Sequence, residues 1–323
     1  MGMDLSYTEG VIAVRDKYLL KDRVLRLCEM TANDAFRSLL EYGYGGGAET
    51  AHSVYDYEKL IEREERALDE FILEYAPSKA DAAYFLAPRD FHNAKALLKA
   101  KLLGADAQKM LASSGQFDVS VLSNCVSAGD YAAIASVPAL KEACESVENL
   151  AENAETLSGK EIGVIFERAT YRYLLDVCRR NGALKRSIVA KIDMTNLLTA
   201  FRAPALETLE NAFIKGGKLD LADIQNALSE NRKDGEAYRR YPEFLGLCFA
   251  AKDRGDPLTM AEKYRDEFDI VRLSENRFEL KRNEPFLYYV LRRKAENANV
   301  RIIFALQLLG ANEQEMKRRL RGI

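Results

Sequence analysis

A carboxylate–amide pair that recurs at a fixed interval constrains this sequence most. The pairs are Asp90 with Asn93, Asp193 with Asn196, and Glu296 with Asn299, and the two members always stand three residues apart. The carboxylates of successive pairs are separated by 103 residues in a chain of 323. An interval of this size is an ordinary domain length. The repetition therefore predicts three similar structural repeats that account for nearly all of the chain.

The spacing of the apolar residues is that of helices. Between residues 60 and 75 most apolar residues recur three, four or seven positions apart, which predicts one amphipathic helix. Pro77 should end this helix, because proline cannot supply the next intrahelical hydrogen bond. Residues 117–122 alternate briefly, but no neighbouring run would pair with them as a strand. The pattern therefore predicts an all-α protein, with a short terminal helix over residues 312–320.

Start and stop signals mark a second long helix. Ser158 and Glu161 have the spacing of a capping box, in which each side chain satisfies the other residue's backbone amide. Asn181 and Gly182 follow the apolar stripe of this helix. Both tolerate a left-handed conformation, so we expect them to end it.

Breaks in the helical pattern divide the chain. Gly104 should end the first motif helix, Pro204 the second, and Gly216-Gly217 should open the third repeat. A looser recurrence of an aspartate close to apolar residues, at Asp34, Asp130 and Asp223, supports the same division. We therefore expect helical repeats over residues 1–110, 111–212 and 213–323.

Composition excludes several classes of protein. The net charge of −3 gives no global basic field that would attract nucleic acid. The cysteine count is odd and no two cysteines form a C-x-x-C pair, which favours reduced thiols in a cytosolic compartment (Cys28, Cys125, Cys144, Cys178 and Cys248). No run of eighteen apolar residues is present, so we expect no membrane span. If the protein functions at a membrane, we expect partner proteins to hold it there.

The recurring pair allows two interpretations. Residues three apart share one face of a helix, and apolar residues follow on that face, so the pair should point inward. Buried carboxylates and amides need partners. The pair could be a metal or acid–base site, or a structural network that fixes how two helices cross. We favour the structural interpretation, because no histidine joins the second and third pairs and a catalytic centre is not needed three times.

Other chemical sites lack their signatures. His52 and His92 are the only histidines, and two distant histidines make no metal-ligand pair. The glycines at 43–47 and 216–217 are not followed by the Gly-Lys-Ser/Thr of a phosphate-binding loop. We therefore assign no catalytic, cofactor-binding or metal-binding residue, and expect no cofactor.

Four stretches in order carry a family resemblance. They are AVRDKYLLKDRVLRLCEMTANDAFRSLLEYGYGG at 13–46, RDFHNAKALLKAKLLG at 89–104, DMTNLLTAFRA at 193–203, and NEPFLYYVLRRKAENANVRIIFALQLLG at 283–310. Together they resemble the C-type central-stalk protein of V-type and A-type ATPases (ATP synthases), whose eukaryotic relative is the d-type protein of the V-ATPase. The resemblance covers the whole chain. One departure is in the third pair, where Glu296 replaces aspartate and Ala305 stands where the others have Lys99 and Arg202.

The resemblance implies a fold and a function. It implies a funnel of three similar helical bundles around a pseudo-threefold axis, and a non-catalytic socket that links the rotating shaft of the soluble head to the membrane rotor ring. Such a socket couples ATP hydrolysis or synthesis to ion transport and lies peripherally at the cytoplasmic face of the membrane. The residues alone leave two alternatives open, a helical-repeat adaptor and an all-α enzyme with a carboxylate-bound metal.

Overall fold

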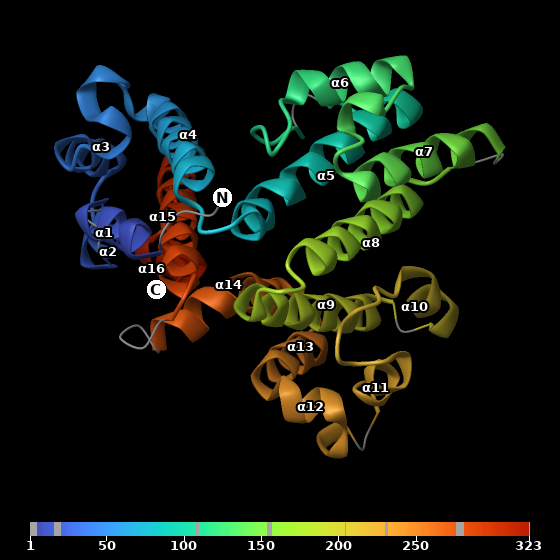
Figure 1. Ribbon diagram of the computed structural model, residues 1–323. Coiled ribbons are helices and arrows are strands. Elements are labelled where there is room, and N and C mark those ends of the chain that lie inside the picture. Colours follow the sequence, from blue (N-terminus) through green and yellow to red (C-terminus); the bar gives the residue numbers. More distant parts are fainter. Residues whose placement is uncertain are drawn as a thin grey trace. The chain divides into compact units, whose positions relative to one another are not determined.

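The chain is folded into helices joined by turns and loops (Figure 1). The computed structural model describes residues 5–15, 21–107, 110–153, 157–203, 205–229, 232–275 and 281–322, and these ranges contain no strand. The all-α prediction is therefore confirmed for them. The backbone forms two compact units: unit 1 consists of residues 1–78 and 267–323, and unit 2 of residues 79–266. The division into three repeats stays a prediction.

Unit 1 is built around one long central helix, α15 (Glu284–Leu308), which packs against α1, α2, α3 and α4. The other elements of this unit, with part of α14 (Thr259–Glu275), are α1 (Leu5–Arg15), α2 (Lys21–Cys28), α3 (Ala32–Glu41), the 3-10 helices η1 (Tyr44–Glu49) and η2 (Val54–Asp56), α4 (Tyr57–Tyr75) and α16 (Glu313–Arg319).

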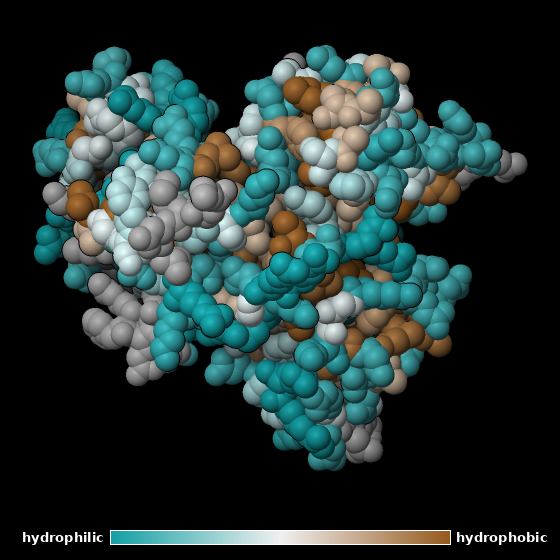
Figure 2. All heavy atoms as spheres, viewed as in Figure 1, coloured by the Kyte–Doolittle hydropathy of each residue, from teal (hydrophilic) through white to brown (hydrophobic). Residues whose placement is uncertain are grey.

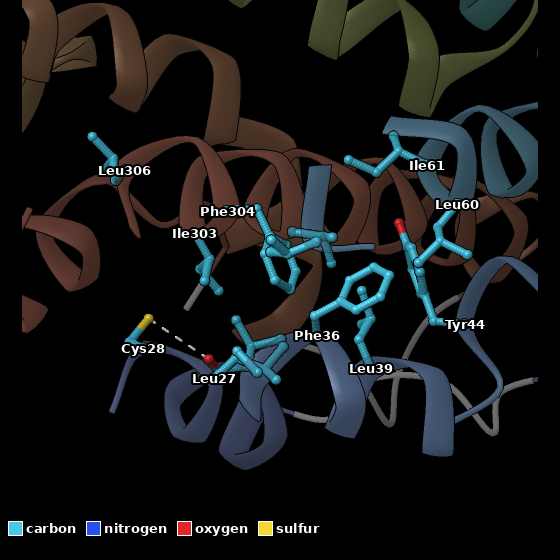
Figure 3. Close-up of a cluster of buried hydrophobic side chains, with 14 of the residues drawn as sticks. Leu27, Cys28, Phe36, Leu39, Tyr44, Leu60, Ile61, Ile303, Phe304 and Leu306 are labelled. Carbon is cyan, nitrogen blue, oxygen red and sulfur yellow. Dashed lines mark hydrogen bonds between the residues drawn. The ribbon is translucent and has the colours of Figure 1, made fainter. Parts of the chain in front are cut away.

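The core of unit 1 lies between α15 and the helices of the N-terminal segment. In Figure 3, Ile303 and Phe304 of α15 face residues from α3, η1 and α4. Phe36 meets Phe304 edge to face, with ring centroids 6.2 Å apart. Each fully buried aromatic or leucine side chain contributes about 1.5–3 kcal/mol, so this cluster holds together segments that are distant in the sequence.

A glycine loop brings η1 close to α4. Gly45 has a left-handed backbone conformation, with φ of 60°. A side chain at this position would place its Cβ 2.6 Å from the Cα of Leu60. The close approach of the two backbones therefore requires glycine on both conformational and steric grounds.

Unit 2 contains two of the long motif helices, α5 (Lys79–Leu103) and α9 (Gly182–Arg202). Pro204, which was expected to end the second of these helices, lies outside the described residues. Helix α8 packs against α5, α7 and α9, and α9 also packs against α10, α11 and α13. The remaining elements are α6 (Val119–Ala128), η3 (Ala132–Ile134), α7 (Pro138–Asn153), α8 (Gly159–Val177), α10 (Leu206–Ala212), α11 (Leu221–Asn226), η4 (Arg232–Asp234), α12 (Glu236–Arg240), α13 (Pro242–Arg254) and the first part of α14.

Most local helix predictions are confirmed, and one is wrong. Helix α4 ends at Tyr75, and α16 begins after its N-cap residue Asn312. Ser158 forms the predicted capping box at the start of α8. Asn181, however, is not the end of α8, which stops at Val177; its side chain accepts a hydrogen bond from Leu184 N and caps the start of α9.

The aspartates of the looser recurrence do not occupy equivalent positions. Asp34 and Asp223 are the third residues of α3 and α11, where each contacts its N-cap residue. Asp130 lies in the turn after α6 and accepts a hydrogen bond from Ala132 N. This recurrence therefore reflects local helix and turn chemistry.

On the face that Figure 2 presents, hydrophilic residues predominate and hydrophobic residues form smaller patches between them.

Candidate functional site

The first two motif asparagines bind backbone through both ends of their amides. Asn93 of α5 is buried, accepts from Ala112 N at 2.8 Å, and donates from Nδ2 to Ala112 O at 3.3 Å. Asn196 of α9 is also buried, accepts from Ile214 N at 2.9 Å, and donates to Ile214 O at 2.9 Å. Each amide thus pairs with the N–H and C=O of one residue, as a neighbouring strand would. We call this arrangement an amide clamp.

The third asparagine makes the same clamp. Asn299 of α15 accepts from Arg321 N at 2.6 Å and donates to Arg321 O at 2.9 Å. The clamped residue lies 18 to 22 positions after the asparagine in all three places. Each long helix therefore holds the chain segment that follows it.

The first aspartate reinforces its clamp. Asp90 has no exposed surface, and its two carboxylate oxygens accept from Gln116 N at 2.9 Å and Phe117 N at 3.2 Å. Burial raises the pKa of Asp90 to about 6, and the two backbone hydrogen bonds oppose this shift. Burial therefore disfavours the ionised form of Asp90 more than the two backbone N–H groups favour it.

The second aspartate is bound in the same way and has a side-chain partner as well. Asp193 accepts from Lys218 N at 2.8 Å and Leu219 N at 3.0 Å through one oxygen, and from the Tyr241 hydroxyl at 2.8 Å through the other. Burial raises the pKa of Asp193, with the hydrogen bonds again opposing. Burial and the nearby Asp193 carboxylate raise the pKa of Tyr241, so its hydroxyl stays protonated and donates.

The third carboxylate belongs to an ion network. Glu296, nearly buried, pairs with Arg293 one turn before it, and Arg293 also pairs with Glu64 of α4. A second arginine, Arg292, lies 3.6 Å from the other oxygen of Glu296. Glu64 in turn accepts from Gly45 N at 2.8 Å. The substitution of glutamate for aspartate therefore accompanies a change of partner from backbone amides to guanidinium groups.

Two glycines complete the aspartate sites, and sequence reasoning predicted this role for neither: Gly217 was expected only to open the third repeat, and Gly115 was not considered. A Cβ at Gly115 would overlap the Asp90 carboxylate and lie 2.6 Å from Leu86 O, and a Cβ at Gly217 would overlap the Asp193 carboxylate. The signal was present in the sequence, because these glycines follow their aspartates by 25 and 24 residues. Only glycine lets the backbone come close enough for its amides to reach the buried carboxylate.

The structure therefore places all six predicted motif residues in buried positions on the three long helices. For both aspartates and all three asparagines, the partners include main-chain groups of a downstream segment. The sequence predicted a structural network that fixes how two helices cross. The network of Glu296 does join α15 to α4 through Arg293 and Glu64, whereas the contacts of the aspartates and asparagines anchor the segment that follows each helix. Buried carboxylates cannot form such contacts without losing hydration, so the hydrogen bonds offset a large part of that cost.

The other residues considered from sequence do not form a chemical centre. His52 and His92 are both exposed, and Nε2 of His92 lies 2.7 Å from Met110 O. All five cysteines are free and buried. In the described ranges, no group of three or more His, Cys, Asp or Glu side chains is placed to hold a metal ion.

Loss of one amide clamp should lower the free energy of unfolding. We expect Asn196→Leu to lower the free energy of unfolding by about 1–3 kcal/mol, because the N–H and C=O of Ile214 would stay buried without their amide partner. Urea denaturation of the variant and of the exposed control Asn149→Leu measures this, and the control should change by less than about 0.5 kcal/mol. An unchanged midpoint for Asn196→Leu would contradict the clamp.

The pKa of Asp90 should be well above that of an ordinary aspartate. Its pKa is about 6 in the folded protein, against about 3.9 in an unfolded chain. The folded state then binds more protons between these values, so the contribution of Asp90 to the free energy of unfolding falls as pH rises from about 4 to about 6, by roughly 2–3 kcal/mol, and is constant above. Carbon-13 NMR of the Asp90 carboxyl reads the midpoint. A midpoint below pH 4 would show that the amide hydrogen bonds outweigh burial.

Three long helices, each with an asparagine that binds the main chain of a downstream segment, define an all-helical protein in the ranges that the structure describes. Residues 9–319 match the family model for the ATP synthase (C/AC39) subunit. The chain belongs to this family, which comprises the C-type and d-type central-stalk proteins of V-type and A-type ATPases. A comparison with curated proteins finds no matching sequence.

Proposed function

We propose that this chain is the non-catalytic socket of the central stalk in a rotary V/A-type ATPase. In this role it receives the rotating shaft of the soluble head on one side and contacts the membrane rotor ring on the other. The observation that carries the proposal is the family match over residues 9–319, which spans almost the whole chain. The chain then couples ATP hydrolysis or synthesis to ion transport by transmitting torque.

The amide clamps support this role physically. A part that transmits torque must resist deformation between its two binding faces. Each long helix is tied by buried hydrogen bonds to the segment after it, and such bonds are stronger in a medium of low dielectric than in water. Loops that would otherwise move independently therefore belong to the rigid body of their helix.

The arrangement of the repeats is part of the same proposal. We infer three helical bundles, over residues 1–110, 111–212 and 213–323, arranged as a funnel around a pseudo-threefold axis. The recurrence of the amide clamp on α5, α9 and α15 supports three related bundles. A socket with such an axis surrounds a shaft evenly, which suits a rotating connection.

Attachment to the membrane is assigned to partner proteins. Among the helices that the structure describes, none combines the length and the apolar character required to cross a bilayer. The net charge of −3 does not favour direct binding to anionic lipid. We propose, from the family role, that the chain lies at the cytoplasmic face of the membrane and is held there by the rotor ring.

A reconstitution experiment tests the proposal. The purified chain should bind the head-and-shaft assembly and the membrane ring of its own ATPase, measured separately by pull-down, and should hydrolyse no ATP alone. Binding to neither assembly would refute the socket. Turnover by the isolated chain that is lost in Asp193→Asn, or a metal bound in stoichiometric amount, would instead identify an enzyme.

A further inference from the structure

Residues 311–322 are the segment that the third amide clamp holds, and α16 lies within it. Asn299 binds the N–H and C=O of Arg321 near the end of this segment. Helix α16 packs against both α2 and α15. Two side chains of the segment, Met316 and Leu320, are buried in the core cluster of unit 1. We call residues 311–322 the strap of unit 1.

The carboxylate that reinforces each clamp in unit 2 has a different role beside the strap. The segment after α5 donates two backbone amides to Asp90, and the segment after α9 donates two to Asp193. In the third motif, Glu296 pairs with Arg293, which also pairs with Glu64 of α4. This carboxylate therefore stabilises the contact of α15 with α4, and the amide clamp on the strap is not reinforced in the way that the first two are.

The ion pairs of the strap lie near the solvent. Lys317 of α16 lies 2.9 Å from Glu29, which follows α2, and 2.6 Å from Glu313 of α16 itself. The side chains of Lys317 and Glu29 keep 32% and 52% of their surface exposed. Exposed ion pairs contribute little and are weakened by salt. A helix of seven residues is also too short to persist in water without packing partners. Docking of the strap therefore depends mainly on its buried side chains and the amide clamp.

A buried thiol belongs to the same part of the core. Cys28 is the last residue of α2, against which α16 packs, and it is only 3% exposed. It shares the core cluster with Met316 and Leu320, and Figure 3 shows it at one edge of that cluster. Burial raises the pKa of Cys28 to about 11. Because the thiolate is the reactive form of cysteine, the docked strap keeps Cys28 unreactive.

We propose that the strap of unit 1 opens reversibly and controls access to Cys28 while the rest of unit 1 stays folded. The aromatic part of the core is independent of the strap, since Phe36 of α3 packs directly on Phe304 of α15. Opening brings Asn299 and the main chain of Arg321 into contact with water, so neither is left buried without a partner. This device belongs to unit 1 itself and does not rest on the proposed function.

Rates of cysteine alkylation test the device. The full-length chain is treated with iodoacetamide under native conditions near pH 8, and mass spectrometry follows each cysteine peptide. We expect Cys28 to react at least about tenfold faster than the four other buried cysteines, Cys125, Cys144, Cys178 and Cys248. A change from about 50 to about 500 mM NaCl should raise the Cys28 rate further, because the ion pairs of Lys317 are exposed.

Substitutions separate opening of the strap from unfolding of the chain. Asn299→Ala removes the clamp and should raise the Cys28 rate about tenfold, while the other four cysteines keep their rates. Gly322→Ala is the second variant. Its side chain would need the left-handed φ of 61° and would lie 2.8 Å from Ile270 Cδ1, so the Cys28 rate should rise about fivefold. The matched control Asn93→Ala removes a clamp in unit 2 and should leave the Cys28 rate unchanged.

Two alkylation results would overturn the inference. Cys28 that reacts as slowly as the other cysteines would show that the strap does not open. An equal rise at all five cysteines in both strap variants would show global unfolding instead.

Hydrogen exchange provides an independent check on the three clamps. After correction for intrinsic rates, the clamped N–H of Arg321 should exchange at least about tenfold faster than those of Ala112 and Ile214, which equivalent asparagines hold. Equal protection of the three amides would contradict an opening that is confined to the strap.

Discussion

Gly217→Ala is expected to lower the free energy of unfolding by about 3–5 kcal/mol. The new methyl group would overlap the Asp193 carboxylate, which cannot turn away without losing its hydrogen bonds from Lys218 N and Leu219 N. Overpacking costs about 1–3 kcal/mol, and breaking the hydrogen bonds of a buried carboxylate adds about 1–3 kcal/mol. Urea denaturation followed by circular dichroism measures the difference.

A second glycine substitution provides the control. Gly163 lies inside α8 with no atom within 4 Å of its Cβ position, so Gly163→Ala should raise the free energy of unfolding by about 0.5–1 kcal/mol. Gly115→Ala should resemble Gly217→Ala, because its methyl group would meet Asp90 and Leu86 O. Equal stability of the Gly217 and Gly163 variants would show that the aspartate site adapts to the added group.

Arg293→Met is expected to lower the free energy of unfolding by about 3–5 kcal/mol. Arg293 is nearly buried and its guanidinium contacts both Glu64 and Glu296, whose side chains are also largely buried. Removing it leaves two carboxylates close together in a medium of low dielectric, which is the costly way to break a buried ion pair. Thermal and urea unfolding of the single variant measure the loss.

The compensated variant separates charge from packing. Arg293→Met combined with Glu64→Leu and Glu296→Leu removes the three most buried charges of the network and leaves the more exposed Arg292 in place. We expect this variant to recover at least half of the lost stability, since apolar replacement of buried ion pairs is often neutral. Stability of the triple variant below that of Arg293→Met would mean that the carboxylates contribute mainly through other hydrogen bonds, such as that from Gly45 N to Glu64.

Sequence alone predicted the helices and the burial of the motif, because both depend on periodicity. The apolar spacing located α4, and the expectation that the motif pairs point inward agrees with their burial on α5, α9 and α15. Capping was predicted less well. Asn181 has the residue type for either end of a helix, and the nearness of α9, which begins at Gly182, decides its role as an N-cap.

The partners of the motif could not be predicted from side-chain types. Asn196 binds the N–H and C=O of Ile214, and every residue except proline carries both groups. The pairing of α4 with α15 was hidden for another reason. Arg301 and Glu58 form an ion pair across 243 residues of sequence, and no local pattern links such distant positions.

The amide clamp also bears on how such a chain can change over generations. Because the asparagine binds main-chain atoms, the residue held at each place is free to vary, and it is alanine, isoleucine or arginine at positions 112, 214 and 321. A substitution in one of these segments can alter the outer surface without releasing the segment from its helix. The segments after α5, α9 and α15 can therefore present different surfaces while each keeps the same amide clamp.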